Sequence, residues 1–418
     1  MKPLPALAVL GAVLGAVYLR DPTFFDTPRF WAEEGSNYFQ SAVARDVPSG
    51  LLNVGAAPHN PYVHPVPQIA TVVAAHAVPL EEAPSVTTFT WLAVLVVFEL
   101  VVLFGGAELL DPPLVRVVCA ASPLLAVGSA ENWANTLGAH FFLDFALLLL
   151  WLEGARATGA RRTAAIAGFA GLALFSPTAF ILTPALFQRA LLDFKRQRPY
   201  VLSLGFAVAA GALVHKLAFA HQARTPPEAR YIPHLFLSKM ILWPLAGHAV
   251  AERYGGWIGA LDEGQVLLSA CVLAPALVLV VGVAAAYSRR DDTTRSLLVT
   301  WLFAAASYLL LGIGVGRDHL PPDNAGRYAF LPGLLLLAFL AHQVASPVAD
   351  RAKIAWAALL GCAVAVGISG YRYSDDISGY MHGAPWAPEV RRFREDRSYE
   401  RLRIAPNPWT VVVSHDRP

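Results

Sequence analysis

Charged residues are scarce in this chain of 418 residues: Asp, Glu, Lys and Arg make up 15% of it, against about 25% in soluble domains. This shortage excludes water as the main solvent. The formal net charge of +2 gives no basic stripe, which argues against nucleic acid as a partner. The 3 cysteines are too far apart for a zinc cluster or a disulfide framework. Walker loops, kinase motifs, Gly-x-Ser-x-Gly and His-Glu-x-x-His are absent too.

Apolar residues are abundant instead, at 56% of the chain, and they gather in long runs. A helix needs about 20 mostly apolar residues to cross a bilayer, and an open strand cannot satisfy its backbone there. The sequence therefore predicts an all-α polytopic membrane protein in a lipid bilayer. The expected spans are 4–19, 89–107, 114–130, 136–152, 201–219, 266–287, 297–315, 328–344 and 354–368.

One further apolar segment, 163–187, is broken by Ser176-Pro177 and is either two tilted spans or a re-entrant hairpin. Counting it as two gives about eleven spans. The run 66–80 is predicted to be a juxtamembrane helix at the interface, with a further span as the alternative.

Orientation follows from Arg and Lys clusters in short connections, which stay cytoplasmic. Such clusters occur at 156–162, 189–198, 289–295 and 351–353. They predict a transmembrane domain over 1–369 that begins with an uncleaved signal anchor. Its long outer loops are 20–86 and 221–265, and a polar extracytoplasmic segment, 370–418, follows it.

The first outer loop carries an acidic pair, Glu33-Glu34, among aromatic residues. Two adjacent carboxylates beside a span suit a general base that works near lipid headgroups. The alternative is that both residues cap a solvated interfacial helix. His59 and His64 follow in the same loop and are candidate substrate-binding residues.

This order of signal anchor, acidic first loop, juxtamembrane helix and many spans resembles the GT-C superfamily of bacterial membrane glycosyltransferases. Glu33-Glu34-x-x-x-Tyr38 is similar to the Asp-Glu-x-x-Tyr pattern of many members. The resemblance implies that an acid of this pair is the catalytic base and that the donor is a polyprenyl-phosphate sugar. Because both acids are Glu here, it leaves open which one is the base.

The resemblance also implies a hexosyl- or pentosyltransferase of the bacterial cell (inner) membrane whose active site faces outward. Its acceptor would be a glycan, lipid or protein of the cell envelope. Whether a divalent cation, Mg²⁺ or Mn²⁺, acts as a cofactor stays open. A transporter or flippase of a lipid-linked sugar, and a non-catalytic envelope-assembly protein, are the alternatives.

A second loop supports the same hypothesis. Arg327-Tyr328 resembles the Arg-Tyr that precedes a late span in bacterial GT-C proteins, and Arg317 and His319 lie in the same loop. An arginine can direct two hydrogen bonds at a phosphate. The alternative is a snorkelling arginine with Tyr328 in the interfacial aromatic belt. Lys216, inside an expected span, is a further candidate phosphate ligand, with an ion pair to Glu99 or Asp144 as the alternative.

Polar residues also mark the turn around Glu131 and Asn135, which are candidate substrate-binding residues. Their spacing predicts a shared helical face, as does that of His140 and Asp144. Because polar groups in lipid are costly unless paired, we expect His140 and Asp144 to form a hydrogen-bonded brace, with a metal site as the alternative.

Overall fold

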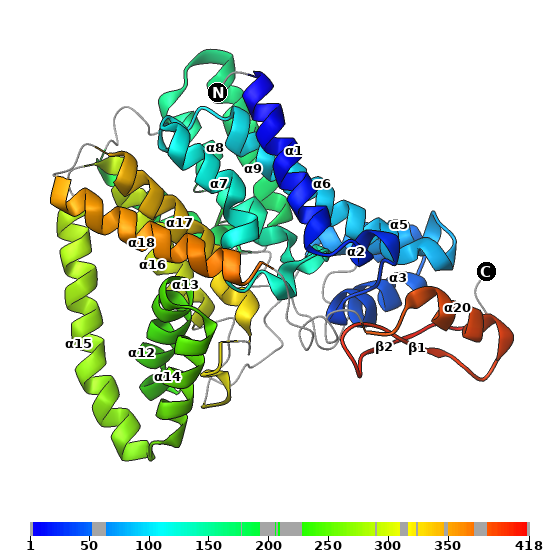
Figure 1. Ribbon diagram of the computed structural model, residues 1–418. Helices are drawn as coiled ribbons and strands as arrows, with labels where there is room; N and C mark the ends of the chain where they lie inside the picture. Colours follow the sequence, from blue (N-terminus) through cyan, green and yellow to red (C-terminus); the bar gives the residue numbers. More distant parts are fainter. Residues whose placement is uncertain are drawn as a thin grey trace.

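The fold is described from a computed structural model of the chain. It describes residues 3–51, 64–176, 178–192, 205, 208–209, 228–288, 291–309, 317–322, 325–346, 350–371 and 383–415. These residues are mostly helical (Figure 1). Within them, one small antiparallel sheet pairs β1 (Arg401–Arg403) with β2 (Thr410–Val412). The expected all-α class is therefore confirmed.

Helices of membrane-spanning character account for much of the described chain. Five are long and apolar enough to cross a membrane: Pro3–Arg20, Leu80–Phe104, Thr136–Arg156, Gly326–Ala345 and Ala352–Ser369. Shorter apolar helices occupy Pro113–Leu125, Ala179–Gln188 and Glu263–Val278. These helices are consistent with an all-α membrane protein. The count of about eleven spans stays a prediction.

The longer helices form a bundle. They are α1 (Pro3–Arg20), α6 (Ala83–Phe104), α7 (Pro113–Leu125), α8 (Ala139–Arg156), α9 (Gly159–Phe175), α10 (Thr183–Leu192), α14 (His248–Ala260), α15 (Glu263–Ser288), α16 (Asp292–Ser307), α17 (Phe330–Ala345) and α18 (Asp350–Ser369). Shorter α-helices are α2 (Thr23–Asp26), α3 (Gln40–Val43), α4 (Val47–Leu51), α5 (Pro65–His76), α12 (Ile232–Leu235), α13 (Trp243–Ala246) and α20 (Trp386–Glu395).

Short 3-10 and π-helical turns connect them. The π-helices are η1 (Glu34–Phe39) and η8 (Phe236–Leu242). The 3-10 turns are η2 (Leu80–Glu82), η3 (Glu108–Leu110), η4 (Ala130–Asn132), η5 (Thr136–Gly138), η6 (Ala179–Leu182), η7 (Ala229–Tyr231), η10 (Arg317–His319) and η11 (Gly326–Ala329).

Two helices, α8 and α17, form the centre of the bundle. Each is apolar on nearly every side, which is typical of a helix that is buried all round. Helix α17 packs against α7, α16 and α18, and α8 packs against α6 and α9. The Phe142 ring lies edge-on to Phe330, with centroids 5.4 Å apart, so the two central helices meet through aromatic side chains.

The segment 163–187 turns back at the predicted break. Helix α9 ends at Phe175, and the hydroxyls of Ser176 and Thr178 donate to Asp144 within α8. At 1.5 Å per residue, this contact lies about 8 Å along α8 from its first residue. The turn therefore lies beside α8, and the choice between two tilted spans and a re-entrant hairpin for 163–187 stays a prediction. The predicted His140–Asp144 brace is wrong, because these hydroxyls are the partners of Asp144.

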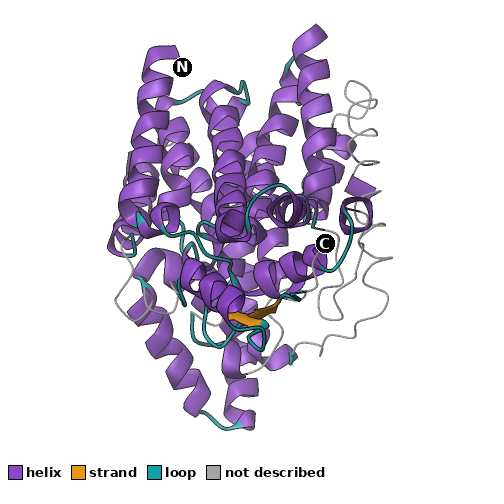
Figure 2. Cartoon of the chain, turned by 90° about the vertical axis from the view of Figure 1, so that its right-hand side faces the viewer, coloured by secondary structure: helices purple, strands orange, loops and turns teal. Residues whose placement is uncertain are grey.

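The first loop and the C-terminal segment pack together away from the bundle centre. Their shared core includes Phe30, Phe39, Trp386, Leu402 and Val411. In Figure 1, α20 and the sheet lie beside α3, and Figure 2 places the sheet among loops and short helices. The segment expected as an appendage is thus packed on the first loop.

Candidate functional site

An ion pair joins the two loops that the sequence singled out. Glu33 comes directly before η1, and Arg327 lies in η11, just before α17. Glu33 Oε1 is 3.7 Å from Arg327 Nη2, and the two side chains are 28% and 29% exposed. The acidic pair and the Arg-Tyr loop therefore meet at one partly open place.

The neighbouring acid, Glu34, lies in a different environment. Its Oε1 accepts hydrogen bonds from Thr136 N and Oγ1, at 2.7 and 2.5 Å. Its Oε2 accepts from Trp31 N and Thr87 Oγ1, each at 3.3 Å. Complete burial raises the pKa of Glu34, although the bonds from Thr136 and Trp31 and the charge of Arg29 oppose this shift. Glu34 thus ties the first loop to the start of α8, and its oxygens are already occupied.

Glu131, in η4, is also close to Arg327. Burial raises the pKa of Glu131, while the charges of Arg327 and Lys239 lower it and that of Glu33 raises it. The backbone N–H of Gly326 also lowers the pKa of Glu131. Two carboxylates, from Glu33 and Glu131, therefore act on one guanidinium.

Two glycines bring η4 and η11 this close. Gly128 has φ +72°, and a Cβ there would be 2.2 Å from the carbonyl oxygen of Gly326. A Cβ on Gly326 would be 3.0 Å from the Trp243 ring. Asn132 Nδ2 then donates to the carbonyl oxygens of Gly128 and Arg327, at 3.0 and 3.3 Å. A larger side chain at Gly128 would push η11 away from η4, and one at Gly326 would press on the Trp243 ring.

The predicted helical face of Glu131 and Asn135 is wrong. Trp133 is extended and Ala134 has φ +52°, so the chain leaves the helical conformation between them. Asn135 instead caps η5, because its Oδ1 accepts from Gly138 N at 3.1 Å. Its Nδ2 donates to the backbone oxygen of Glu131 at 2.8 Å, so its contact with the site is structural.

Lys239, in η8, is a cation that the sequence reasoning missed. It is completely buried, and its Nζ donates to the carbonyl oxygens of Pro321 and Pro322 at 2.9 and 3.1 Å. Burial and the charge of Lys239 lower the pKa of His319. His319 Nδ1 is buried and has no hydrogen-bond partner among the described residues. A lone lysine inside the apolar run 235–243 was the signal for this site, since such residues are often functional.

The remaining predicted residues fall into three groups. The Arg327 guanidinium lies 5.2 Å from the Tyr328 ring centre, so Tyr328 belongs to the site. His64 precedes α5, and its Nε2 is 3.2 Å from Nδ1 of His140, so the two histidines form a pair that links the first loop to α8. His59 and Lys216 lie outside the described residues, as does the side chain of Arg317.

The arrangement combines a proton acceptor with anion-binding groups. Glu33 Oε2 is buried without a hydrogen-bond partner in the described part of the chain. Beside it, Arg327 offers a guanidinium that suits phosphate or carboxylate, and the buried ammonium of Lys239 adds a second positive charge. Among the described residues, no group of three or more His, Cys, Asp or Glu side chains could hold a metal ion.

Fold and composition define the class: this is a mostly helical membrane protein. Comparison with protein-family models, with curated proteins and with solved structures finds no match for the chain.

Proposed function

We propose that the chain is a membrane glycosyltransferase of GT-C type. It transfers a sugar from a polyprenyl-phosphate donor to an extracytoplasmic acceptor of the cell envelope, with Glu33 as the general base. The observation that carries the proposal is the approach of Glu33 Oε1 to within 3.7 Å of Arg327 Nη2. It puts a proton acceptor beside a phosphate-binding group, and the resemblance of both loops to GT-C proteins supports the same function.

In the proposed reaction, Glu33 takes the proton of the acceptor hydroxyl as its oxygen attacks the anomeric carbon. The bond between that carbon and the phosphate oxygen breaks, and the lipid phosphate leaves with the electron pair. Arg327 stabilises the negative charge that develops on the phosphate. When the donor is absent, Arg327 pairs with Glu33, so donor binding draws the guanidinium away and frees the base.

Lys239 and Glu131 complete the site. The two carbonyl oxygens that accept from Lys239 hold its ammonium in place, so it adds a fixed positive charge that acts on Glu131. Glu131 also attracts the guanidinium and helps to orient it. The buried setting strengthens each of these interactions relative to water.

The test compares Glu33→Gln with Glu34→Gln in vesicles supplied with a polyprenyl-phosphate sugar and acceptor. Loss of a general base costs about 10²- to 10⁴-fold in rate, so Glu33→Gln should fall by this amount while its unfolding temperature stays near that of the wild type. Glu34→Gln should lose stability instead. Glu82→Gln, in the same loop, is the matched control. Full transfer by a folded Glu33→Gln variant would show that the proposal is wrong.

A transporter or flippase of a lipid-linked sugar is the second candidate. Glu99, in α6, is completely buried, and neither of its carboxylate oxygens has a hydrogen-bond partner among the described residues. Ionisable groups inside spans often mark ion or substrate pathways. In proteoliposomes, movement of the lipid-linked sugar across the bilayer that is lost in Glu99→Gln, with no product formed, would favour transport over transfer.

A further inference from the structure

The C-terminal segment 383–415, called the tail below, pairs with the first loop directly before Glu33. Ala32 N donates to the carbonyl oxygen of Ala405 at 2.5 Å, and Ala405 N donates to that of Phe30 at 3.2 Å. These bonds make a parallel bridge between Trp31 and Ala405. The tail therefore holds the backbone that leads into the acidic pair.

Side chains join the same two parts of the chain. A Cβ on Gly35 would lie 2.6 Å from Ile404 Cδ1 and 3.1 Å from Val411 Cγ2, so the tail packs directly against the first turn of η1. The Phe30 and Trp386 rings meet edge to face, with centroids 5.1 Å apart. At the rim, Arg394 Nη2 pairs with Glu81 Oε2 at 2.9 Å.

The held backbone has an unusual conformation. Ala32 has φ +34°, a region that residues with a Cβ seldom adopt and keep only when their surroundings hold them there. Directly after this turn the two acids separate, because Glu34 reaches Thr136 and Glu33 reaches Arg327. The hydrogen bond from Ala32 N to the carbonyl oxygen of Ala405 therefore holds the backbone at the residue that determines where the Glu33 side chain points.

We propose that the tail is a positioning element of the Glu33 site, and that Ala405 acts through its backbone to fix the Glu33 carboxylate against Arg327. The effect on sugar transfer rests on the proposed function; the effect on Glu33 geometry does not. Undocking the tail releases Ala32 and lets Glu33 move, whereas Arg327 and Lys239 keep their own contacts. A small misplacement of a catalytic group costs up to about 100-fold in rate.

The test uses Gly35→Ala, which places a methyl group against Ile404 Cδ1, and Gly35→Ala with Ile404→Val, which removes that atom. Gly50→Ala is the matched control, because its Cβ would meet Val72 Cγ2 at 2.9 Å in the first loop and no tail atom within 4 Å. Two quantities are measured in vesicles: trypsin cleavage after Arg401 and Arg403, mapped by mass spectrometry, and kcat and KM for transfer from the polyprenyl-phosphate sugar.

We expect Gly35→Ala to raise tail cleavage and to lower kcat, each about tenfold, as overpacking of a filled core should. KM for the donor should stay within about twofold because the phosphate-binding groups are untouched. The double variant Gly35→Ala with Ile404→Val should reverse most of both changes, the rise in cleavage and the fall in kcat. Gly50→Ala should leave cleavage unchanged. Increased cleavage with unchanged kcat, or no rescue by Ile404→Val, would overturn the proposal.

A second readout separates this inference from the proposed function. Glu33→Cys is labelled with a maleimide in a chain whose exposed Cys271 and Cys362 are replaced by Ser. Gly35→Ala should speed this labelling about tenfold, because overpacking releases the tail from residues 30–32. If the wild type transfers no sugar but the labelling changes as expected, the proposed function fails and the positioning stands. Unchanged labelling overturns the positioning whether or not sugar is transferred.

Discussion

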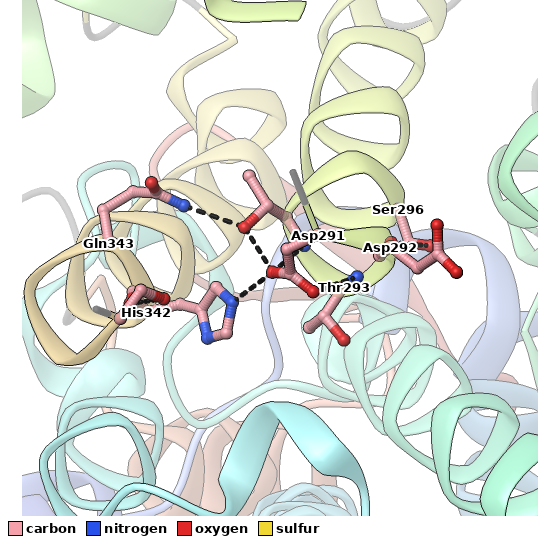
Figure 3. Close-up of polar contacts among 8 residues, drawn as sticks. Asp291, Asp292, Thr293, Ser296, His342 and Gln343 are labelled. Atoms are coloured by element: carbon pink, nitrogen blue, oxygen red, sulfur yellow. Dashed lines mark hydrogen bonds and ion pairs between the residues drawn. The ribbon is translucent and has the colours of Figure 1, made fainter. Parts of the chain in front are cut away.

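The two ends of α17 carry polar clusters of opposite character. In its last turn, His342 Nε2 lies 2.7 Å from Asp291 Oδ2, and Gln343 donates to Thr294 Oγ1 at 3.0 Å (Figure 3). Before its first turn, Arg327 faces Glu33 and Glu131. The first cluster joins α17 to α16, and the second joins three distant parts of the chain.

The two clusters differ in how many hydrogen bonds their carboxylate oxygens accept. Asp291 is the N-cap of α16: its carboxylate accepts from Thr293 N and Thr294 N, at 3.1 and 2.9 Å, and from Thr294 Oγ1. Burial raises the pKa of Asp291, but the bonds from His342 and Thr294 outweigh it and the pKa ends below its usual value. Glu33, by contrast, keeps a buried oxygen without a partner among the described residues. A saturated carboxylate stabilises a fold, whereas an unsaturated one beside a cation can act on a substrate.

The largest effect that tests this contrast is expected at Arg327. Arg327→Ala should lower sugar transfer about 10²- to 10³-fold, because a preorganised donor to the departing charge is lost. Arg327→Lys should recover only part of the rate, since an ammonium cannot form the two parallel bonds of a guanidinium. Initial rates at saturating donor measure both. His342→Gln, at the other end of α17, is the control. If His342→Gln lost as much sugar transfer as Arg327→Ala, the two ends of α17 would not differ in function.

A smaller effect, on stability, is expected from Glu34→Gln. The new amide group would face donors on both sides of the former carboxylate, so the free energy of unfolding should fall by about 1–3 kcal/mol. Because the folded pKa of Glu34 is raised from 4.5, its proton-linked stability is full below pH 4.5 and is lost as the pH rises through the folded pKa. The stability difference between wild type and variant should therefore shrink with rising pH, measured by thermal unfolding in detergent. A difference that grows with pH would contradict the assignment.

Local features of this fold could be predicted from the sequence. The apolar runs gave most of the helices, and Ser176-Pro177 marked the break in 163–187, because proline and hydropathy act over a few residues. The N-cap at Asp291 is equally local. The Arg-Tyr dipeptide before α17 and the acidic pair at the start of η1 were also visible as patterns, and the structure brings Glu33 and Arg327 together.

Long-range packing decided the rest. Nothing in the spacing of Glu33 and Glu34 tells which one reaches Thr136, because the positive φ of Ala32 and its bond to Ala405 set their directions. The contribution of Lys239 depends on residues 321–322 of a loop distant in sequence. Docking of the tail depends on the shape of Gly35 and Ile404, which hydropathy does not record.

The smallest effect is expected at the end of α17 away from the site. Asp291→Ala removes an N-cap and the partner of His342, so the free energy of unfolding should fall by about 1 kcal/mol, while Asp291→Asn should keep the cap and lose less.

Because the folded pKa of Asp291 is lowered, its contribution to stability is present above the unfolded pKa, near 3.8, and is lost as the pH falls through the folded pKa. This pH dependence has the opposite sign to that of Glu34. Thermal unfolding of each variant against pH measures this, with sugar transfer measured on the same samples. Transfer should stay at the wild-type rate, since α16 and α17 still pack through their apolar faces. Loss of transfer in a folded Asp291→Ala protein would mean that the saturated cluster also serves the reaction.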